Sequence, residues 1–180
     1  MQYSIFPKKT HYIKLKTPKD VLFKELSGII EYGASSSIWF KKNDKIFAGY
    51  IQGEKFDIKL KTSYRNSFKP RIYIEIIEHN SFTELKIEYQ IETITKIFMV
   101  LFIILLLFIQ SIQIYFNIDR IIKGVHLESL FPLGMLFFLF LLSRMGFYMS
   151  MGQSDTVLYK FLIKVERKYL GMHAGSFGKK

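Results

Sequence analysis

The chain has no cysteine among its 180 residues, which excludes a disulfide framework and any metal site built on thiolates. Its four histidines are scattered, without the spacing that a metal site needs. The sequence also lacks a glycine-rich phosphate loop, a nucleophile elbow and a paired-carboxylate pattern. Nothing in it names a reaction, so we expect no enzymatic activity, no metal and no cofactor.

Charge is missing from one long stretch and nearly missing from a second. Residues 97–118 contain no charge, and residues 130–151 contain only Arg144. A helix rises about 1.5 Å per residue, so about 20 apolar residues cross a hydrocarbon core of roughly 30 Å. We therefore predict a transmembrane hairpin over 96–152, with helices at about 97–116 and 130–151. The N-terminus has no apolar stretch of signal-peptide type, and no cleaved signal is expected.

The net charge of +11 is unevenly distributed. Residues 1–96 hold 17 basic and 11 acidic residues, the loop at 117–128 holds two of each, and residues 152–180 hold six basic and two acidic. Lys and Arg that flank membrane spans favour the cytoplasmic side, so we predict both termini there. The lysines alternate along strands, as on a solvated face. This pattern favours anionic lipid headgroups and the bilayer over nucleic acid as partners.

The first 95 residues have the pattern of an α+β domain. A strand at 12–16 alternates apolar and basic residues, and a helix follows, opened by Thr17-Pro18 and ended by Gly33. The period then changes to two, which predicts a five-strand meander. Its strands are expected at 38–41, 45–52, 55–62, 71–78 and 82–92. Because the connections are too short for crossovers, we expect the meander to be antiparallel.

The segment 153–170 after the second span has the pattern of an amphipathic helix, and the tail 171–180 reads as disordered. With both ends of the hairpin in the cytoplasm, this helix emerges beside the N-terminal domain. It either docks on the sheet, which gives a helix-grip or START-like arrangement, or lies flat at the lipid interface.

The loop before the fourth meander strand is the most distinctive segment. Tyr64, Arg65, Asn66 and Ser67 form a candidate ligand-binding loop, in which Arg65 faces an anion such as a phosphate or lipid headgroup. The alternative is a long β-connection whose polar side chains satisfy its own backbone.

Two motifs carry a resemblance that covers most of the chain from about residue 45. Residues 47–58 contain a G-x-hydrophobic-x-G-x-x-F hairpin, and residues 64–70 read Y-R-N-S-F-x-P. Together with residues 131–135 at the start of the second span, they resemble a family of small, uncharacterised bacterial membrane proteins. The resemblance implies an envelope location, here the bacterial inner membrane, and a head before two spans. It implies no activity. Lys69 departs from the more usual aliphatic residue before the loop proline.

Polar residues within the spans are candidates for anchoring. Arg144 is expected to snorkel to the headgroups from about 10 Å depth, and a transport or sensing role is the alternative. Tyr115 is a candidate aromatic anchor at the outer interface. Nearby Gln110, Ser111 and Gln113 either mark that interface or form interhelical hydrogen bonds.

These patterns leave three functional hypotheses. The first is a membrane-anchored binding or sensory module whose head binds a partner protein, a lipid headgroup or a small ligand. The second is an accessory or assembly subunit, or a homo-oligomer, joined through its spans; Gly146 and Ser150 form a small-xxx-small pair that suits close helix packing. The third is an enzyme whose site no motif reveals.

Overall fold

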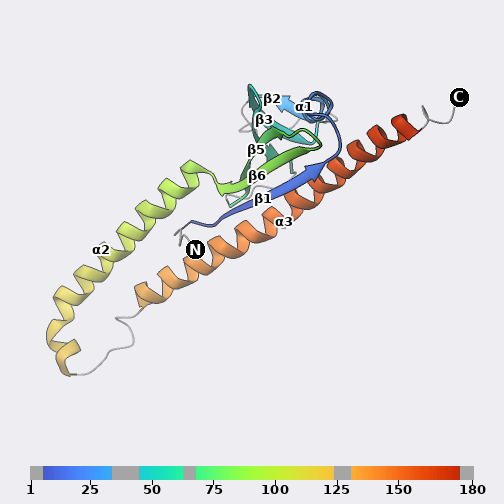
Figure 1. Cartoon of the computed structure of the whole chain (residues 1–180). Helices are drawn as coiled ribbons and strands as arrows, with labels where there is room; N and C mark the ends of the chain where they lie inside the picture. Colours follow the sequence, from blue (N-terminus) through green and yellow to red (C-terminus); the bar gives the residue numbers. More distant parts are fainter. Residues whose placement is uncertain (1–5, 34–44, 63–67, 124–130, 175–180) are drawn as a thin grey trace, which may run out of the picture.

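A computed structural model of the chain describes residues 6–33, 45–62, 68–123 and 131–174. It has an α+β head and two long helices that extend from one end of the head (Figure 1). The elements in chain order are β1 (Lys8–Leu15), α1 (Lys19–Gly28), β2 (Ile30–Tyr32), β3 (Phe47–Gln52), β4 (Lys55–Leu60), β5 (Pro70–Glu78), β6 (Thr83–Ile91), α2 (Thr93–Lys123) and α3 (Phe131–Ala174).

The strands form one six-stranded sheet in the order β1-β6-β5-β4-β3-β2. The strands β3 to β6 form an antiparallel meander, as predicted, and β1 pairs antiparallel with β6. The sheet as a whole is mixed, since β2 pairs parallel to β3, and the sequence did not predict β2 as a strand. The reason is that α1 ends at Gly28, not Gly33, and Ile30–Tyr32 pairs beside β3. The chain between Tyr32 and Phe47 is long enough for a crossover. The strand expected at 38–41 lies outside the described residues.

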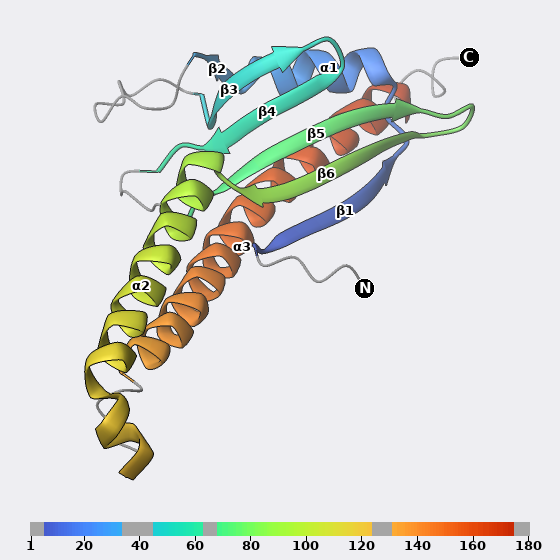
Figure 2. The ribbon, with the colours of Figure 1, turned by 90° about the vertical axis from the view of Figure 1, so that its left-hand side faces the viewer.

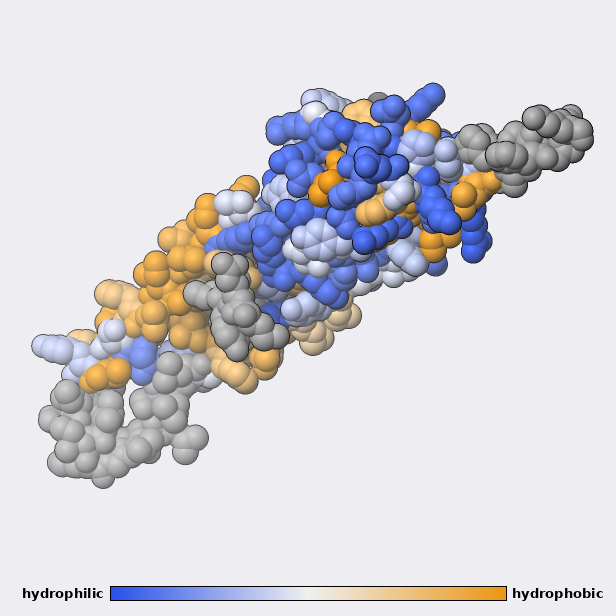
Figure 3. All heavy atoms as spheres, in the orientation of Figure 1, coloured by the Kyte–Doolittle hydropathy of each residue, from blue (hydrophilic) through white to orange (hydrophobic). Residues whose placement is uncertain are grey.

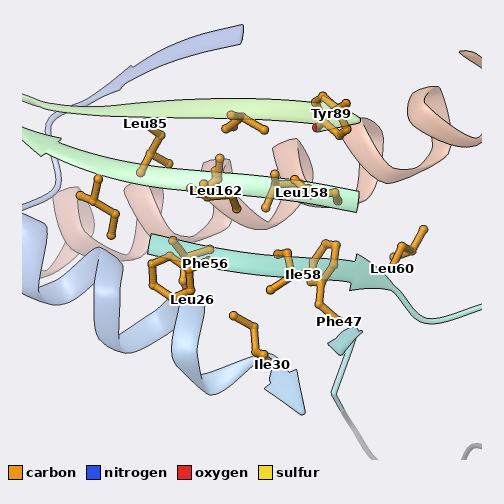
Figure 4. Close-up of a cluster of buried hydrophobic side chains, with 14 of the residues drawn as sticks. Leu26, Ile30, Phe47, Phe56, Ile58, Leu60, Leu85, Tyr89, Leu158 and Leu162 are labelled. Carbon is orange, nitrogen blue, oxygen red and sulfur yellow. The ribbon is translucent and has the colours of Figure 1, made fainter. Parts of the chain in front are cut away.

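The inner face of the sheet holds the core. Alternate residues of β4, β5 and β6 are buried, as period-two patterning requires. Leu22 and Leu26 of α1 and Leu158 and Leu162 of α3, each pair four residues apart, lie on this face at 0–1% exposure. Figure 2 shows α3 running beneath the sheet and α1 beside β3 and β4, and Figure 4 shows the side chains between them. Two helices therefore close one face, while no described element covers the other, which we call the open face.

The two glycines of the hairpin motif, Gly49 and Gly53, are each required for a different structural reason. Gly53 adopts φ 58°, a left-handed conformation that glycine reaches freely, in the two-residue turn between β3 and β4. At Gly49 the neighbouring strand lies so close that a Cβ would stand 2.1 Å from the carbonyl oxygen of Asp57. The motif ends at Phe56, which is 1% exposed in the core. The motif is thus a packing requirement of this hairpin.

The second apolar run and the amphipathic segment, expected as separate helices, form one helix of 44 residues. The polar residues at the junction do not interrupt it. Within the helix, the Ser154 hydroxyl donates to the Ser150 carbonyl and the Thr156 hydroxyl donates to the Gly152 carbonyl. The far half of α3 docks on the head: Leu158, Leu162 and Val165 lie in the core. Of the two alternatives for this segment, the structure has the docked one.

Two helical segments are long and apolar enough to cross a membrane, Thr93–Phe116 and Gly134–Gly171. In their most apolar 18-residue windows, 17% and 22% of the residues are buried, which distinguishes them from core helices of a soluble protein. Figure 3 shows the apolar surface gathered on the two helices beyond the head, while the head surface is mainly hydrophilic.

Candidate functional site

The segment after the predicted loop is fixed against α3. Tyr64, Arg65, Asn66 and Ser67 lie outside the described residues, so their proposed role stays a prediction. Phe68, the next residue, packs on α3 at Gly146, where a Cβ would lie 3.2 Å from Phe68 Cδ2. Gly146 is therefore covered by the chain's own loop residue.

Lys69 follows Phe68 at the start of β5 and is partly buried. Its Nζ donates to Thr62 Oγ1 over 2.9 Å, and no carboxylate among the described residues pairs with it. Burial, with a smaller contribution from the positive charge of Lys59, lowers the pKa of Lys69 from 10.5 to about 8. The ammonium group thus stands in a place that disfavours its charge.

Lys69 belongs to a group of basic residues at the end of the sheet where α2 begins. We call Lys59, Lys69, Arg71 and Lys96 the basic edge. Within it, Lys59 pairs with Glu92 and Arg71 pairs with Asp57. Lys96 donates instead to the neutral amide oxygen Oε1 of Gln90 over 3.2 Å. The acids at this edge are therefore already paired, whereas Lys69 and Lys96 have neutral partners.

Arg144 lies on α3 three residues before Phe147, the first described α3 side chain in the core of the head. Its guanidinium carbon lies 4.7 Å from the centroid of the Phe140 ring, a cation–π geometry. Its Nε atom is buried with no hydrogen-bond partner among the described residues. Exposed apolar side chains continue to Met149, so Arg144 lies about one to two turns inside the apolar surface of α3.

Tyr115 lies near the opposite end of the hairpin. It is 76% exposed on α2 and contacts the Phe116 ring edge-on, which fits an outward-facing aromatic. Gln110 and Gln113 are more buried than their neighbours, and Ser111 donates to the carbonyl of Leu107 within its own helix. The structure does not bring Tyr115 and Arg144 into one site.

The open face of the sheet carries a cleft of about 370 Å³. Its lining comes mainly from outward-facing side chains of β4, β5 and β6, including Lys55, Asp57, Tyr73, Glu75, Lys86 and Glu88. Lys55 pairs with Glu75 over 3.1 Å, which leaves the Tyr73 ring as the large apolar surface of the cleft. Partial burial raises the pKa of Tyr73, so its hydroxyl is protonated and can donate at neutral pH. Sequence reasoning treated this face only as solvated.

A buried polar contact ties α3 to the sheet. The Tyr89 hydroxyl donates to Asp155 Oδ1 over 2.8 Å, and Tyr89 is fully buried. Burial and this carboxylate raise the pKa of Tyr89, which keeps its hydroxyl protonated. The His11 ring contacts Tyr89 edge-on at 5.9 Å.

No group of three or more His, Asp or Glu side chains suited to a metal ion occurs in the described ranges. The candidate binding surfaces in these ranges are a cleft on the open face and a basic edge beside the apolar helices. No protein-family model, curated protein or solved structure matches the chain.

Proposed function

We propose that the chain is a membrane-anchored, non-enzymatic binding or sensory module of the bacterial inner membrane. The apolar parts of α2 and α3 span the bilayer, and both termini lie in the cytoplasm. The head binds a partner protein or small ligand through the open face of its sheet. Tyr64, Arg65, Asn66 and Ser67 bind an anion such as a phosphate or lipid headgroup.

The exposure of the apolar helices supports the membrane attachment. Phe98 and Phe108 of α2 and Phe137 and Met149 of α3 are each 62–69% exposed. Large apolar side chains exposed along neighbouring helices are typical of a membrane or protein contact, and their exposure to water is unfavourable. The basic residues that follow the second apolar run, Lys160 and Lys164 among them, and Lys96 before the first span favour the cytoplasm for the head.

The observation that carries the binding role is the difference between the two faces of the sheet. The inner face is filled by α1 and α3, with Leu26, Leu158 and Leu162 at 0–1% exposure. The open face keeps the 370 Å³ cleft with Tyr73 in its lining. A ligand or partner therefore meets concave, partly apolar surface on the open face.

The strand order and the docked α3 also support a helix-grip, START-like arrangement, in which a long C-terminal helix lies across one face of the sheet. The alternative of an accessory subunit assembled through its spans has less support. Gly146, the small residue that suits close packing of another helix, is covered by Phe68.

Reporter fusions test the membrane topology. We expect a cytoplasmic signal from a fusion at Lys180 and an external signal from one near Gly124. An external C-terminus, or a full-length chain that stays in solution without detergent, would refute the anchored module.

Co-purification in mild detergent followed by mass spectrometry tests the open face. We expect the species enriched with wild type to be lost with Tyr73→Ala and kept with Tyr159→Ala, a matched control at an exposed tyrosine of α3, away from the open face. Arg65→Ala tests the loop in the same way. Equal recovery with wild type and Tyr73→Ala would show that the cleft is not the binding surface.

A further inference from the structure

The basic edge lies where the head meets both apolar helices. β6 ends at Ile91 and α2 begins at Thr93, so Glu92 alone separates the sheet from the first span. Figure 2 shows α2 leaving the sheet at the end of β6, next to the start of β5. Phe68 is held on α3 at Gly146, which places Lys69 at this same end.

Within the part of the chain that the structure describes, Lys69 and Lys96 are the basic-edge members without an acidic partner. Lys59 and Arg71 are neutralised by Glu92 and Asp57. Lys69 and Lys96 donate to a threonine hydroxyl and a glutamine amide oxygen, respectively. The basic edge therefore carries two uncompensated positive charges, which an anion can neutralise.

The position of Lys69 gives an anion a specific advantage. A partly buried ammonium without a counter-ion costs free energy, because the charged form loses hydration. An anion that approaches Lys69 restores that lost interaction. A solvated surface lysine offers no such gain, since its charge already has water.

We propose that Lys69 and Lys96 bind the phosphate group of an anionic phospholipid headgroup at the cytoplasmic surface of the bilayer. The inference rests on the membrane attachment proposed above. It adds the ligand class and assigns binding to the described lysines.

The surroundings of Lys96 favour a lipid over a soluble phosphate. Ile97 and Phe98 follow it directly on α2 and are 56% and 69% exposed. A phospholipid places its phosphate at Lys96 and its acyl chains along these side chains, so one ligand satisfies both the charge and the apolar surface. A free phosphate covers the charge alone.

Native mass spectrometry of the full-length chain in a neutral detergent tests the proposal. The probes are dioctanoyl phosphatidylglycerol, dioctanoyl phosphatidylcholine and glycerol phosphate, each titrated against wild type, Lys69→Gln, Lys96→Gln and Lys24→Gln. Lys24 is an exposed lysine of α1 and serves as the matched control. We expect phosphatidylglycerol to bind wild type and Lys24→Gln equally. Each basic-edge variant should bind about fivefold more weakly, since one lysine near an anionic lipid contributes about 1 kcal/mol.

The three probes separate the sources of the anion. Binding of phosphatidylglycerol without comparable binding of the other two supports a lipid phosphate site. Equal affinity for glycerol phosphate would overturn the lipid assignment, and equal affinity of wild type and both glutamine variants would overturn the site itself. A chain with the wrong topology in the reporter assay would instead refute the membrane attachment, so the two failures are distinguishable.

Discussion

Phe68 and Gly146 form the contact that joins the start of β5 to the apolar part of α3. The Phe68 ring stands so close that a Cβ at position 146 would lie 3.2 Å from Cδ2 and 3.3 Å from Cβ of Phe68. Phe68 directly precedes Lys69, so the contact also positions this member of the basic edge. The same residue thus links the head, the span and the proposed lipid site.

Gly146→Ala should destabilise the head, although alanine is the better helix former. In a helix interior, replacing glycine by alanine normally stabilises by about 1 kcal/mol. At 146 the new methyl group displaces Phe68, and we expect the overpacking to cost about 1–3 kcal/mol. Urea unfolding of the full-length chain in neutral detergent, followed by near-ultraviolet circular dichroism, measures the difference.

Gly152→Ala is the matched control, because no heavy atom lies within 4 Å of a Cβ built there, outside the helix's own backbone. It should stabilise by about 0.5–1 kcal/mol. In a Phe68→Ala background, Gly146→Ala should lose most of its cost, since the displaced ring is gone. A cost that survives in that background would contradict the Phe68 contact.

Leu162→Ala should detach the C-terminal half of α3 from the sheet. Leu162 is 1% exposed in the core, and truncation of a buried leucine costs about 2–5 kcal/mol. We expect hydrogen exchange of the amides of residues 157–170 to accelerate markedly. Tyr159→Ala is the control, since Tyr159 is 53% exposed on the same helix and its loss should leave the exchange unchanged. Slow exchange in Leu162→Ala would mean that something other than the sheet protects this segment.

Alternation explains why much of the sheet was predictable. Lys55–Leu60, Pro70–Glu78 and Thr83–Ile91 fall within two residues of the predicted strands, because each buries every second residue on one packed face. Ile30–Tyr32 was missed because three residues carry no period, and their pairing with β3 depends on a parallel crossover. The pairing of β2 with β3 depends on tertiary structure, so the local sequence pattern cannot predict it.

Tyr89→Phe should weaken the attachment of α3 without emptying the core. The variant keeps the ring but removes the hydroxyl, so the carboxylate of Asp155 loses the hydrogen bond that it accepts from Tyr89. We expect a loss of about 1.5–3 kcal/mol in unfolding free energy at pH 7. Asp155→Asn should cost less, because the Tyr89 hydroxyl keeps an oxygen acceptor. If Tyr89→Phe is as stable as wild type, the bond has no net energetic role.

The candidate site was less predictable than the sheet. Arg144 stands out in sequence because a charge in an apolar run is rare. Lys69 does not stand out, because exposed and half-buried lysines look alike in a basic sequence. Its partial burial depends on tertiary packing, beside the point where Phe68 contacts α3. The continuity of α3 was hidden too: Gly152, Gln153 and Ser154 resemble a polar break in the sequence, yet the helix continues through them and its far half packs on the sheet.

Lys69→Met should stabilise the head in neutral detergent, and the gain should shrink as pH rises. The folded-state pKa of Lys69 is about 8, below the ordinary value of 10.5, so between these values the unfolded chain binds a proton that the folded chain has released. The stability of wild type therefore rises with pH across this window. Methionine removes the charge, so it gains most below pH 8, by on the order of 1 kcal/mol once the part-exposure of the site is allowed for.

Urea unfolding at pH 7 and pH 10 measures that difference, with Lys24→Met, at an exposed position of α1, as the matched control. A gain at pH 10 equal to that at pH 7 would show that Lys69 is not disfavoured as a cation. Addition of phosphatidylglycerol should abolish the gain at pH 7 because the lipid phosphate then compensates the charge of wild type.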